Sequence, residues 1–256
     1  MTTPEVLVHR DILELAEAAA ARLTTRIVEV QAARGRACVV LTGGGVGTAV
    51  LAELAASPSR DSVDWQRLDV WWGDERYLPA GDPDRNETAA RAALLDLVPV
   101  VASAVHPMPA RDGDSSPEAA AERYAAELAG QADRGGALPR FDVLLLGVGP
   151  DAHVASLFPE QPALHERDRT VVAVRGAPKP PPVRLTLTLA AIRSAEEVWL
   201  LAAGAEKARA LRLALSDAGS VQVPAAGARG RRRTLALLDE SAASALPPSL
   251  GRIASP

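Results

Sequence analysis

The chain lacks several features that define other classes of protein. It has 256 residues and a single cysteine, Cys38, which excludes an internal disulfide bond. Cys38 lies in the apolar run 37–41, where buried packing is its expected role. No run approaches the ~20 apolar residues of a membrane-spanning helix. The first residues lack the basic and apolar segments of a secretory signal, so we expect a soluble, cytoplasmic protein.

Neither sign of charge dominates. Lys and Arg number 28 and Asp and Glu 32, a net charge of −4 at pH 7, so no global field attracts nucleic acid or an anionic membrane. The basic run 229–233 has no interleaved aromatic residue and is expected to be a solvated entrance to a strand. The four histidines are dispersed and lack the paired spacing of zinc ligands. We therefore expect no metal, no cofactor and no nucleic-acid partner.

Motifs of nucleotide binding and covalent catalysis are absent too. The glycine loop 43–47 would need a glycine at position 50 to match the dinucleotide fingerprint, and Val50 stands there. The loop also lacks the Gly-Lys-Ser/Thr of a P-loop, and the chain has no Gly-x-Ser-x-Gly nucleophile elbow. Such a loop either offers backbone N–H groups to a phosphate or is simply a tight turn.

Strand and helix signals alternate through the chain. We expect strands at 37–41, 68–72, 141–147, 171–174, 184–188, 197–202 and 234–238, and helices at 11–34, 48–56, 85–96, 117–132 and 206–216. Asp11 is the expected cap of the first helix. Helical segments between strands imply βαβ units and a mostly parallel sheet covered on both faces. With no internal repeat or long linker, one α/β domain over residues 1–256 is expected.

An acid and an imidazole follow the apolar strand at 141–147. Ligands gather outside the carboxyl ends of parallel strands, and histidine exchanges protons near neutral pH. Asp151 and His153 are therefore predicted to be a catalytic pair. The alternative is that Asp151 caps a following helix and His153 is an ordinary surface residue.

Two further charged segments favour an anionic ligand. Asp74-Glu75-Arg76 follows the strand at 68–72, and its arginine would suit a carboxylate, a phosphate or a developing oxyanion. The other interpretation is a solvated turn. Lys179 and Arg184 lie in a stiff proline segment, which either positions two cations at low entropic cost or serves only as a rigid connection.

Together these segments resemble the 6-phosphogluconolactonase family, which is related to the glucosamine-6-phosphate deaminases. The resemblance covers nearly the whole chain in order: the loop 42–47, Asp-Glu-Arg at 74–76, Asp-Arg-Asn at 84–86, Gly-Val-Gly-Pro-Asp-Ala-His-Val-Ala-Ser-Leu-Phe-Pro at 147–159, Pro-Lys-Pro-Pro-Pro-Val-Arg-Leu-Thr-Leu-Thr at 178–188, and Gly204 with Lys207. It implies a single-domain, Rossmann-like three-layer fold with a mostly parallel sheet flanked by helices. The histidine block and the proline–arginine block are its most specific parts.

The resemblance also implies a reaction and its residues. The reaction is hydrolysis of 6-phospho-D-glucono-1,5-lactone to 6-phospho-D-gluconate, the second step of the oxidative pentose phosphate pathway, without a metal or a covalent intermediate. The expected catalytic residues are His153, Asp151 and Arg76. The expected substrate-binding residues are Thr42, Gly43, Gly44, Gly45, Asp74, Asn86, Lys179, Arg184 and Lys207. The partner is a small sugar phosphate lactone, and the protein is expected to be a monomer or a weak homo-oligomer.

Departures from the related sequences separate the alternatives. The deaminases have Asp-Glu-Tyr where this chain has Asp-Glu-Arg, and a glutamate where this chain has Phe158, which cannot transfer a proton. A non-catalytic sugar-phosphate sensor is a further alternative. Ala152 replaces the family's glycine, at a cost of about a kcal/mol or more if that position needs a positive φ. The glycine loop also lacks the family's usual serine, so Thr42 offers the nearest hydroxyl.

Overall fold

The computed structural model describes residues 2–113, 115–133, 135–216, 218–247, 250 and 252–253. The strands are β1 (Glu5–His9), β2 (Ala37–Leu41), β3 (Leu68–Trp72), β4 (Asp74–Arg76), β5 (Val105–His106), β6 (Val143–Gly147), β7 (Val171–Val174), β8 (Arg184–Leu187), β9 (Glu197–Ala202), β10 (Arg233–Asp239) and β11 (Arg252–Ile253). The α-helices are α1 (Ile12–Arg34), α2 (Gly44–Ala56), α3 (Asn86–Ala93), α4 (Pro117–Gly130), α5 (Leu189–Ile192), α6 (Ala208–Ala214), α7 (Pro224–Gly227) and α8 (Glu240–Ala243). Short 3-10 helices are η1 (Pro58–Ser62), η2 (Trp65–Arg67), η3 (Leu95–Leu97), η4 (Ala102–Ala104), η5 (Pro162–His165) and η6 (Ala205–Lys207).

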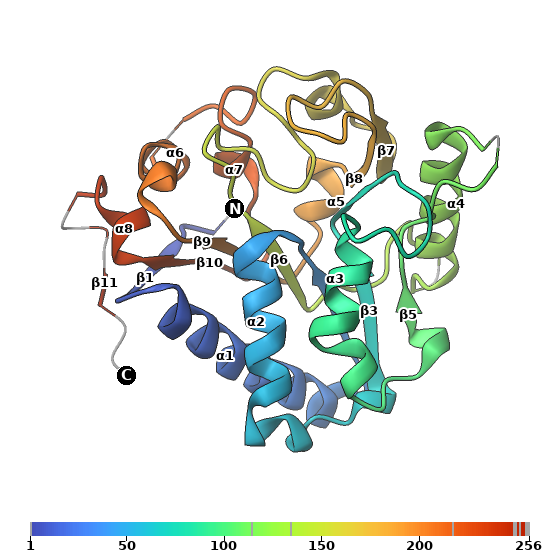
Figure 1. The fold of residues 1–256 in the computed structure, drawn as a ribbon, viewed down its shortest axis with the longest axis horizontal. Helices are drawn as coiled ribbons and strands as arrows, with labels where there is room; N and C mark the ends of the chain where they lie inside the picture. The colour runs from blue at the N-terminus through green and yellow to red at the C-terminus, as the bar shows by residue number, and fades with distance from the viewer. Residues whose placement is uncertain are drawn as a thin grey trace.

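A parallel sheet forms the middle of the molecule. Its strand order is β11-β1-β10-β9-β6-β2-β3-β5, and every pair of neighbours is parallel (Figure 1). The chain proceeds from β2 to β3 on one side and from β6 to β9 on the other, so the winding reverses between β6 and β2. Such a switch point leaves a crevice at the carboxyl ends of the strands. The expected α/β class with a mostly parallel sheet is confirmed.

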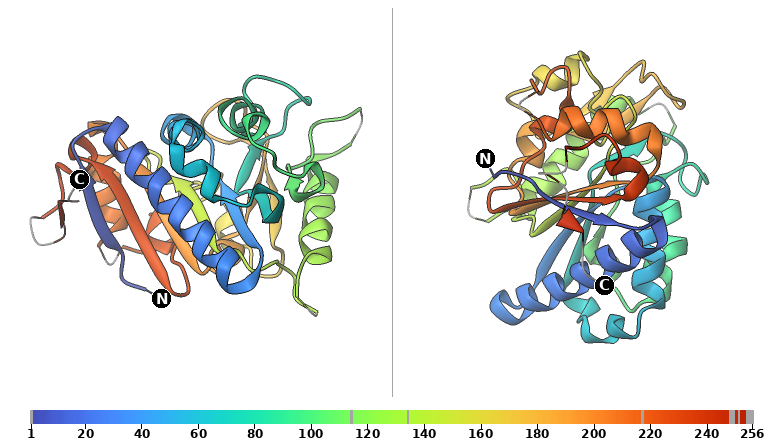
Figure 2. Two further views of the ribbon diagram at one scale, coloured as in Figure 1. Left: turned by 90° about the horizontal axis from the view of Figure 1, so that it is seen from below. Right: turned by 90° about the vertical axis from the view of Figure 1, so that its left-hand side faces the viewer.

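Helices cover both faces of this sheet. α1 and α2 pack together on one face, and α6 lies on the opposite face (Figure 2). The expected cap holds at the start of α1, where the Asp11 carboxylate accepts hydrogen bonds from the N–H groups of Leu13 and Glu14. None of the helices in the described part of the chain combines the length and apolarity needed to cross a membrane.

Most of the buried apolar residues join into one large cluster, and Phe158, Val174 and Ala177 form a second, small one. The large cluster extends from Val6 to Ala242 and includes the interiors of β2, β6 and β9, which are buried on both faces. Strands buried in this way read as continuous apolar runs, which is why the sequence located them. One large cluster from Val6 to Ala242 is consistent with a single domain. The assignment of residues 1–256 to one domain stays a prediction.

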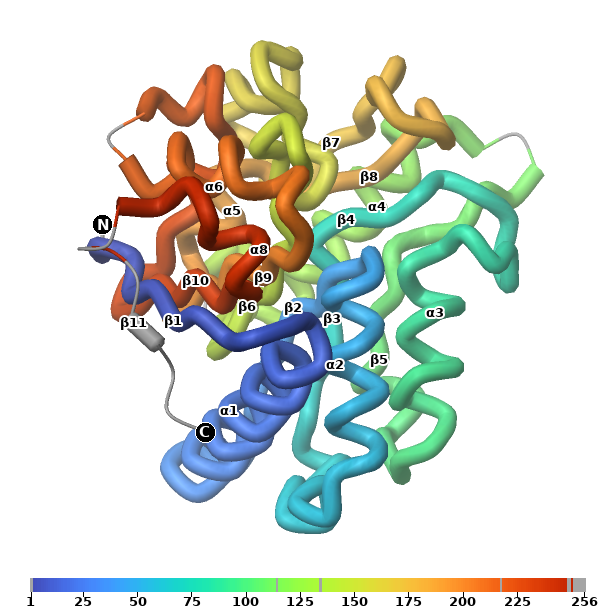
Figure 3. Tube along the Cα trace, turned by 60° about the vertical axis from the view of Figure 1, so that its left-hand side comes forward, coloured from blue at the N-terminus to red at the C-terminus, as the bar shows by residue number. Residues whose placement is uncertain are grey.

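A second, antiparallel sheet was not expected from the sequence. It has the order β4-β8-β7 and lies beyond the carboxyl ends of β2 and β3 (Figure 3). The charged triplet 74–76 is its first strand, because it pairs with β8. Arg76 lies directly opposite Arg184 in this pairing. The small sheet therefore joins two predicted site segments that are about a hundred residues apart in sequence.

Other boundaries differ from the expectation. β1 was not predicted, and α2 begins at Gly44 rather than at 48. The segment after Asp151 forms no helix, so Asp151 is not a helix cap. Tight turns stand there instead, closed by a bridge between Val148 and Val154. Positive φ angles at Ala152 and Ala155 explain the difference, since a helix requires negative φ throughout.

The basic run at 229–233 is solvated only in part. Arg229 is 9% exposed, and its guanidinium donates hydrogen bonds to the carbonyls of Ala214, Ala225 and Ala228. Burial lowers the pKa of Arg229. The expectation of a solvated strand entrance was wrong at this residue, because three backbone carbonyls replace water around its guanidinium.

Candidate active site

A cavity of about 290 Å³ opens at the carboxyl ends of β2, β3, β6 and β9, beside the switch point. All the predicted site residues except Asp151 line it: Thr42, Gly43, Gly44, Gly45, Asp74, Arg76, Asn86, His153, Lys179, Arg184 and Lys207. Asp151 contacts His153 directly. The fold thus brings together residues that the sequence distributes over 166 positions, from 42 to 207.

The glycine loop carries the chain from β2 into α2. Gly43 precedes α2 in an extended conformation, and no side chain caps the helix. The first N–H groups of α2 therefore keep their hydrogen-bonding capacity, and the helix dipole favours an anion beside them. The Thr42 hydroxyl accepts a hydrogen bond from the N–H of Gly147 at 3.1 Å, which joins the loop to the end of β6. Backbone N–H groups are thus the loop's main means of binding an anion.

Asn86 is packed directly against this loop. A β-carbon added to Gly43 would lie 1.9 Å from Oδ1 of Asn86, so any larger residue there would displace the Asn86 side chain. The Asn86 amide donates to the backbone carbonyl of Asp74 at 2.9 Å. The Asp74 carboxylate in turn accepts a hydrogen bond from the hydroxyl of Ser156 at 2.6 Å. The wall of the cavity is therefore a buried polar network rather than a solvated turn.

Asp151 and His153 meet across the turn after β6. Nδ1 of His153 lies 2.5 Å from Oδ1 of Asp151, and the turn is closed by a hydrogen bond from the N–H of Gly149 to the carbonyl of His153. Burial acts to raise the pKa of Asp151, but the hydrogen bond and charge of His153 outweigh it and lower this pKa to about 2. An ionised Asp151 accepts Nδ1–H, which leaves Nε2 as the proton acceptor of the imidazole.

Ala152, between these two residues, has a φ of 66° and is 2% exposed. Left-handed backbone costs a non-glycine residue about 1–2 kcal/mol. The position where the family has glycine does require a positive φ, so the alanine in this chain carries backbone strain. The Ala152 carbonyl accepts a hydrogen bond from the N–H of Ala225 at 3.0 Å, so packing from a distant segment holds the strained residue in place.

Three further cations, Lys179, Arg184 and Lys207, line the cavity. The Arg184 guanidinium donates to the carbonyls of Lys179, Pro180 and Pro181 at 3.1 Å, and burial lowers its pKa. Burial also lowers the pKa of Lys207, with the charge of Lys179 acting in the same direction. Cations that are desolvated and close together favour an anionic ligand, whose charge would offset both effects.

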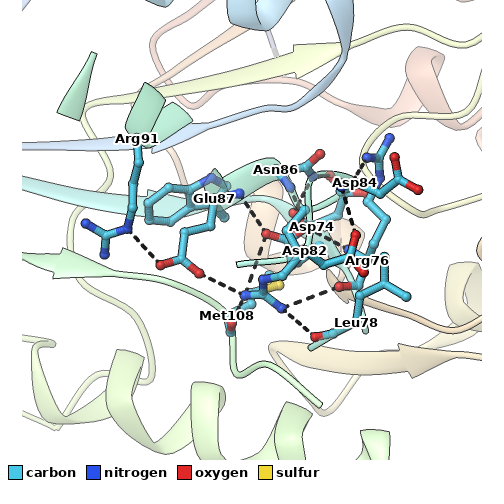
Figure 4. A network of polar contacts seen from close by, with 12 residues as sticks. Asp74, Arg76, Leu78, Asp82, Asp84, Asn86, Glu87, Arg91 and Met108 are labelled. Atoms are coloured by element: carbon cyan, nitrogen blue, oxygen red, sulfur yellow. Dashed lines mark hydrogen bonds and ion pairs between the residues drawn. The ribbon is translucent and has the colours of Figure 1, made fainter. Parts of the chain in front are cut away.

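Arg76 points its guanidinium back toward the start of α3. It donates a hydrogen bond to the backbone carbonyl of Asp84 (Figure 4). Figure 4 shows Asp74, Arg76, Asp84 and Asn86 gathered at one end of a polar network that continues to Glu87 and Arg91. The charged triplet is thus half of a larger network, not an isolated turn.

Several residues at the site were not among the expected site residues. Glu75 is fully buried, and the Ser156 hydroxyl donates to Asp74. A β-carbon at Gly149 would collide with the imidazole of His153, and the Phe158 ring lies 4.6 Å from that imidazole. Each of them lies in a segment that the sequence did single out: Glu75 in the charged triplet, and the other three in the block 147–159. Among the residues that the structure describes, no group of three or more His, Cys, Asp or Glu side chains could hold a metal ion.

The switch-point cavity, the uncapped helix and the acid–imidazole pair define an α/β protein with a site for a small anion and for proton transfer. Residues 10–237 match the family of glucosamine-6-phosphate isomerases and 6-phosphogluconolactonases. The chain belongs to this family.

Named relatives and solved structures agree. The chain is 63% identical to the 6-phosphogluconolactonase of Streptomyces coelicolor over 252 residues, which cover 97% of each chain. It is 49% identical to the 6-phosphogluconolactonase of Mycobacterium tuberculosis, over 95% of this chain and 98% of the other. The structure of 6-phosphogluconolactonase from Trypanosoma brucei matches with a TM-score of 0.83 and 29% identity, covering 96% of this chain and 100% of that one.

Proposed function

We propose that this chain hydrolyses 6-phospho-D-glucono-1,5-lactone to 6-phospho-D-gluconate, as a carboxylic-ester hydrolase of the oxidative pentose phosphate pathway. The observation that carries the proposal is the contact between Asp151 and His153 at a cavity rich in cations and backbone N–H groups. The names and extents of the relatives described above support the same substrate.

His153 is the general base in this mechanism. Nε2 takes a proton from a water molecule as its oxygen forms a bond to the lactone carbonyl carbon, C1. The carbonyl oxygen becomes an oxyanion, which the Arg76 guanidinium stabilises. The bond between C1 and the ring oxygen then breaks, and the proton on Nε2 passes to the ring oxygen, which becomes a hydroxyl. Asp151 holds the imidazole orientation and stabilises its charge while the proton resides there.

The 6-phosphate lies at the other end of the substrate. The N–H groups at the start of α2, with Arg184 and Lys207, would bind it, and Lys179, Asp74 and Asn86 complete the rim. The helix terminus supplies fixed dipoles and the two side chains supply full charges. With the phosphate bound there, the lactone end of the substrate would lie toward His153, which lines the same cavity.

Phe158 separates this function from the isomerising chemistry of related deaminases. It is 1% exposed and packs against the imidazole of His153. A phenyl ring offers no proton for opening a sugar ring. A non-catalytic sugar-phosphate sensor with the same pocket is the alternative that the experiment must exclude.

The test is lactone hydrolysis with the substrate generated in situ, spontaneous opening subtracted and EDTA present. The wild type should accelerate hydrolysis, and His153→Ala should abolish the acceleration. Asp151→Asn should lower kcat by about 100-fold or more with little change in KM, because the imidazole loses its orientation. Binding of 6-phosphogluconate without turnover by folded wild type would favour the sensor. A cytoplasmic location and a monomer or weak homo-oligomer stay predictions.

A further inference from the structure

Glu75 is a fully buried carboxylate beside the cavity that the mechanism above leaves without a role. Oε1 accepts hydrogen bonds from the N–H groups of Arg76 at 2.8 Å and Asn86 at 2.7 Å. Oε2 accepts one from the N–H of Glu87 at 2.9 Å. The Arg85 guanidinium lies 3.8 Å away and is buried as well. Burying a carboxylate is costly unless it is paired and hydrogen-bonded, so this arrangement has a function beyond filling space.

The first function is to complete helix α3. The residue at its N-cap position is Arg85, whose side chain makes no capping hydrogen bond. The first N–H groups of a helix need acceptors from elsewhere, and Glu75 supplies them to Asn86 and Glu87 from a separate strand. A carboxylate is also the group that the positive end of the helix dipole favours. Glu75 thus fixes the spacing between β4 and the start of α3.

That spacing determines where Arg76 can hold its side chain. The backbone N–H of Arg76 binds Glu75, and its guanidinium binds the carbonyl of Asp84, two residues before Asn86 (Figure 4). The backbone of Arg76 is therefore attached to Glu75 itself, and its guanidinium is attached to the segment just before α3, whose first N–H groups bind Glu75. Nε of Arg76 is buried without an acceptor among the described residues, and the hydrogen bond of the guanidinium goes to the Asp84 carbonyl.

We propose that Glu75 is a positioning residue, which places the Arg76 guanidinium relative to His153 by holding β4 and the start of α3 together. The inference rests on the proposed function, because it takes the oxyanion role of Arg76 from there. Displacing a group by about 1 Å can cost roughly 100-fold in rate, so the loss of this attachment should be visible in turnover.

The first experiment compares Glu75→Gln with Glu87→Gln. Glu87 lies in α3 and pairs with Arg85 and Arg91. The donors to its carboxylate are these side chains rather than backbone N–H groups, and it does not line the cavity. Glu75→Gln should lower kcat by about 10- to 100-fold and change KM less than about threefold, because Arg76 acts in the transition state. Glu87→Gln should keep both values near those of the wild type. A folded Glu75→Gln enzyme with unchanged kcat would overturn the inference.

A double-mutant cycle tests whether Glu75 acts through Arg76. In an Arg76→Ala background, Glu75→Gln should lower kcat by less than about twofold further. The same loss in both backgrounds would show that Glu75 acts by another route. If Glu75→Gln does not fold, Glu75→Asp takes its place, since it keeps the charge but withdraws the carboxylate by one methylene.

Amide hydrogen exchange separates this inference from the proposed function. Glu75→Gln should speed exchange at Asn86 and Glu87 by about 10-fold or more relative to the wild type, as the local structure opens more readily. This holds whether or not the wild type hydrolyses the lactone. Unchanged exchange at both amides would contradict the positioning role even in an active enzyme. If exchange is faster but the wild type has no lactonase activity, Glu75 still joins β4 to the start of α3, and only the proposed reaction is refuted.

Discussion

The backbone of Gly149 lies so close to His153 that a β-carbon at this position would be 2.0 Å from Nδ1 of the imidazole. The same atom would be 2.5 Å from Oδ1 of Asp151. Glycine is therefore the residue that lets the acid and the imidazole meet. The contact between Asp151 and His153 therefore requires that residue 149 has no β-carbon.

Gly149→Ala should lower kcat by about 100-fold or more, because the ring must move by an ångström or more to make room. The measurement is steady-state lactone hydrolysis, with thermal unfolding to show that the variant folds. Gly130→Ala is the matched control, since a β-carbon there would meet nothing within 4 Å. It should leave kcat unchanged. A folded Gly149→Ala enzyme with wild-type kcat would show that His153 is not held as we describe.

Arg184→Ala should act on KM rather than on kcat. A charge-assisted hydrogen bond to a phosphate contributes about 1.5–3 kcal/mol, so KM should rise by roughly 10-fold or more. Arg175→Ala is the control. Arg175 follows β7, which pairs with β8, but it is exposed and pairs with Glu118 at the surface. Such pairs are worth about 1 kcal/mol or less. Equal KM values in the two variants would remove Arg184 from phosphate binding.

The sequence was informative wherever local pattern determines structure. β2, β3 and β9 follow from apolar runs, and the cap of α1 follows from Asp11. It also located the cavity, because Asp151 and His153 stand directly after β6. These features depend on residues close together in the chain.

Long-range contacts explain what the sequence left out. The triplet 74–76 becomes a strand only because β8 lies beside it, and Glu75 is buried only because α3 begins beside β4. Strand preference depends strongly on such neighbours. Arg229 is buried by carbonyls from three separate positions. Ala225 and Ala228 are near Arg229 in the chain, but only the fold brings the Ala214 carbonyl to its guanidinium, so the local pattern indicated a solvated residue.

Ala152→Gly tests the strain at the turn. Replacing a buried alanine by glycine normally costs about 1–2 kcal/mol, from the lost methyl contact and the freer unfolded chain. At Ala152, relief of the left-handed strain should return about 1–2 kcal/mol, so the free energy of unfolding should hardly change. Ala195→Gly is the control, since Ala195 is fully buried and is not among the described residues with positive φ.

Denaturant unfolding of the two variants gives the comparison. Ala195→Gly should lose about 1–2 kcal/mol more than Ala152→Gly, while the latter keeps its lactone hydrolysis. Equal losses at the two positions would mean that Ala152 carries no strain, and that the family's glycine serves only close packing.

The burial of Glu75 should also make stability depend on pH. Desolvation raises the pKa of Glu75 from 4.5 to about 7, although the charge of Arg85 and three backbone N–H groups act against this shift. The folded state then holds a proton that the unfolded state has already lost between pH 4.5 and about 7. The stabilising contribution of this group is therefore fully present below pH 4.5 and declines as pH rises to about 7.

Glu75→Gln removes this dependence, because glutamine does not titrate. The free energy of unfolding of the variant, relative to the wild type, should therefore increase between pH 4.5 and pH 8 by an amount on the order of 3 kcal/mol. Denaturant unfolding of both proteins at several pH values measures it. A constant difference across this range would mean that Glu75 titrates as an exposed carboxyl does. An increase in this difference would mean that Glu75 lowers the stability of the wild type near neutral pH. Glu75 is then charged, the form that best accepts the three N–H groups through which it positions Arg76.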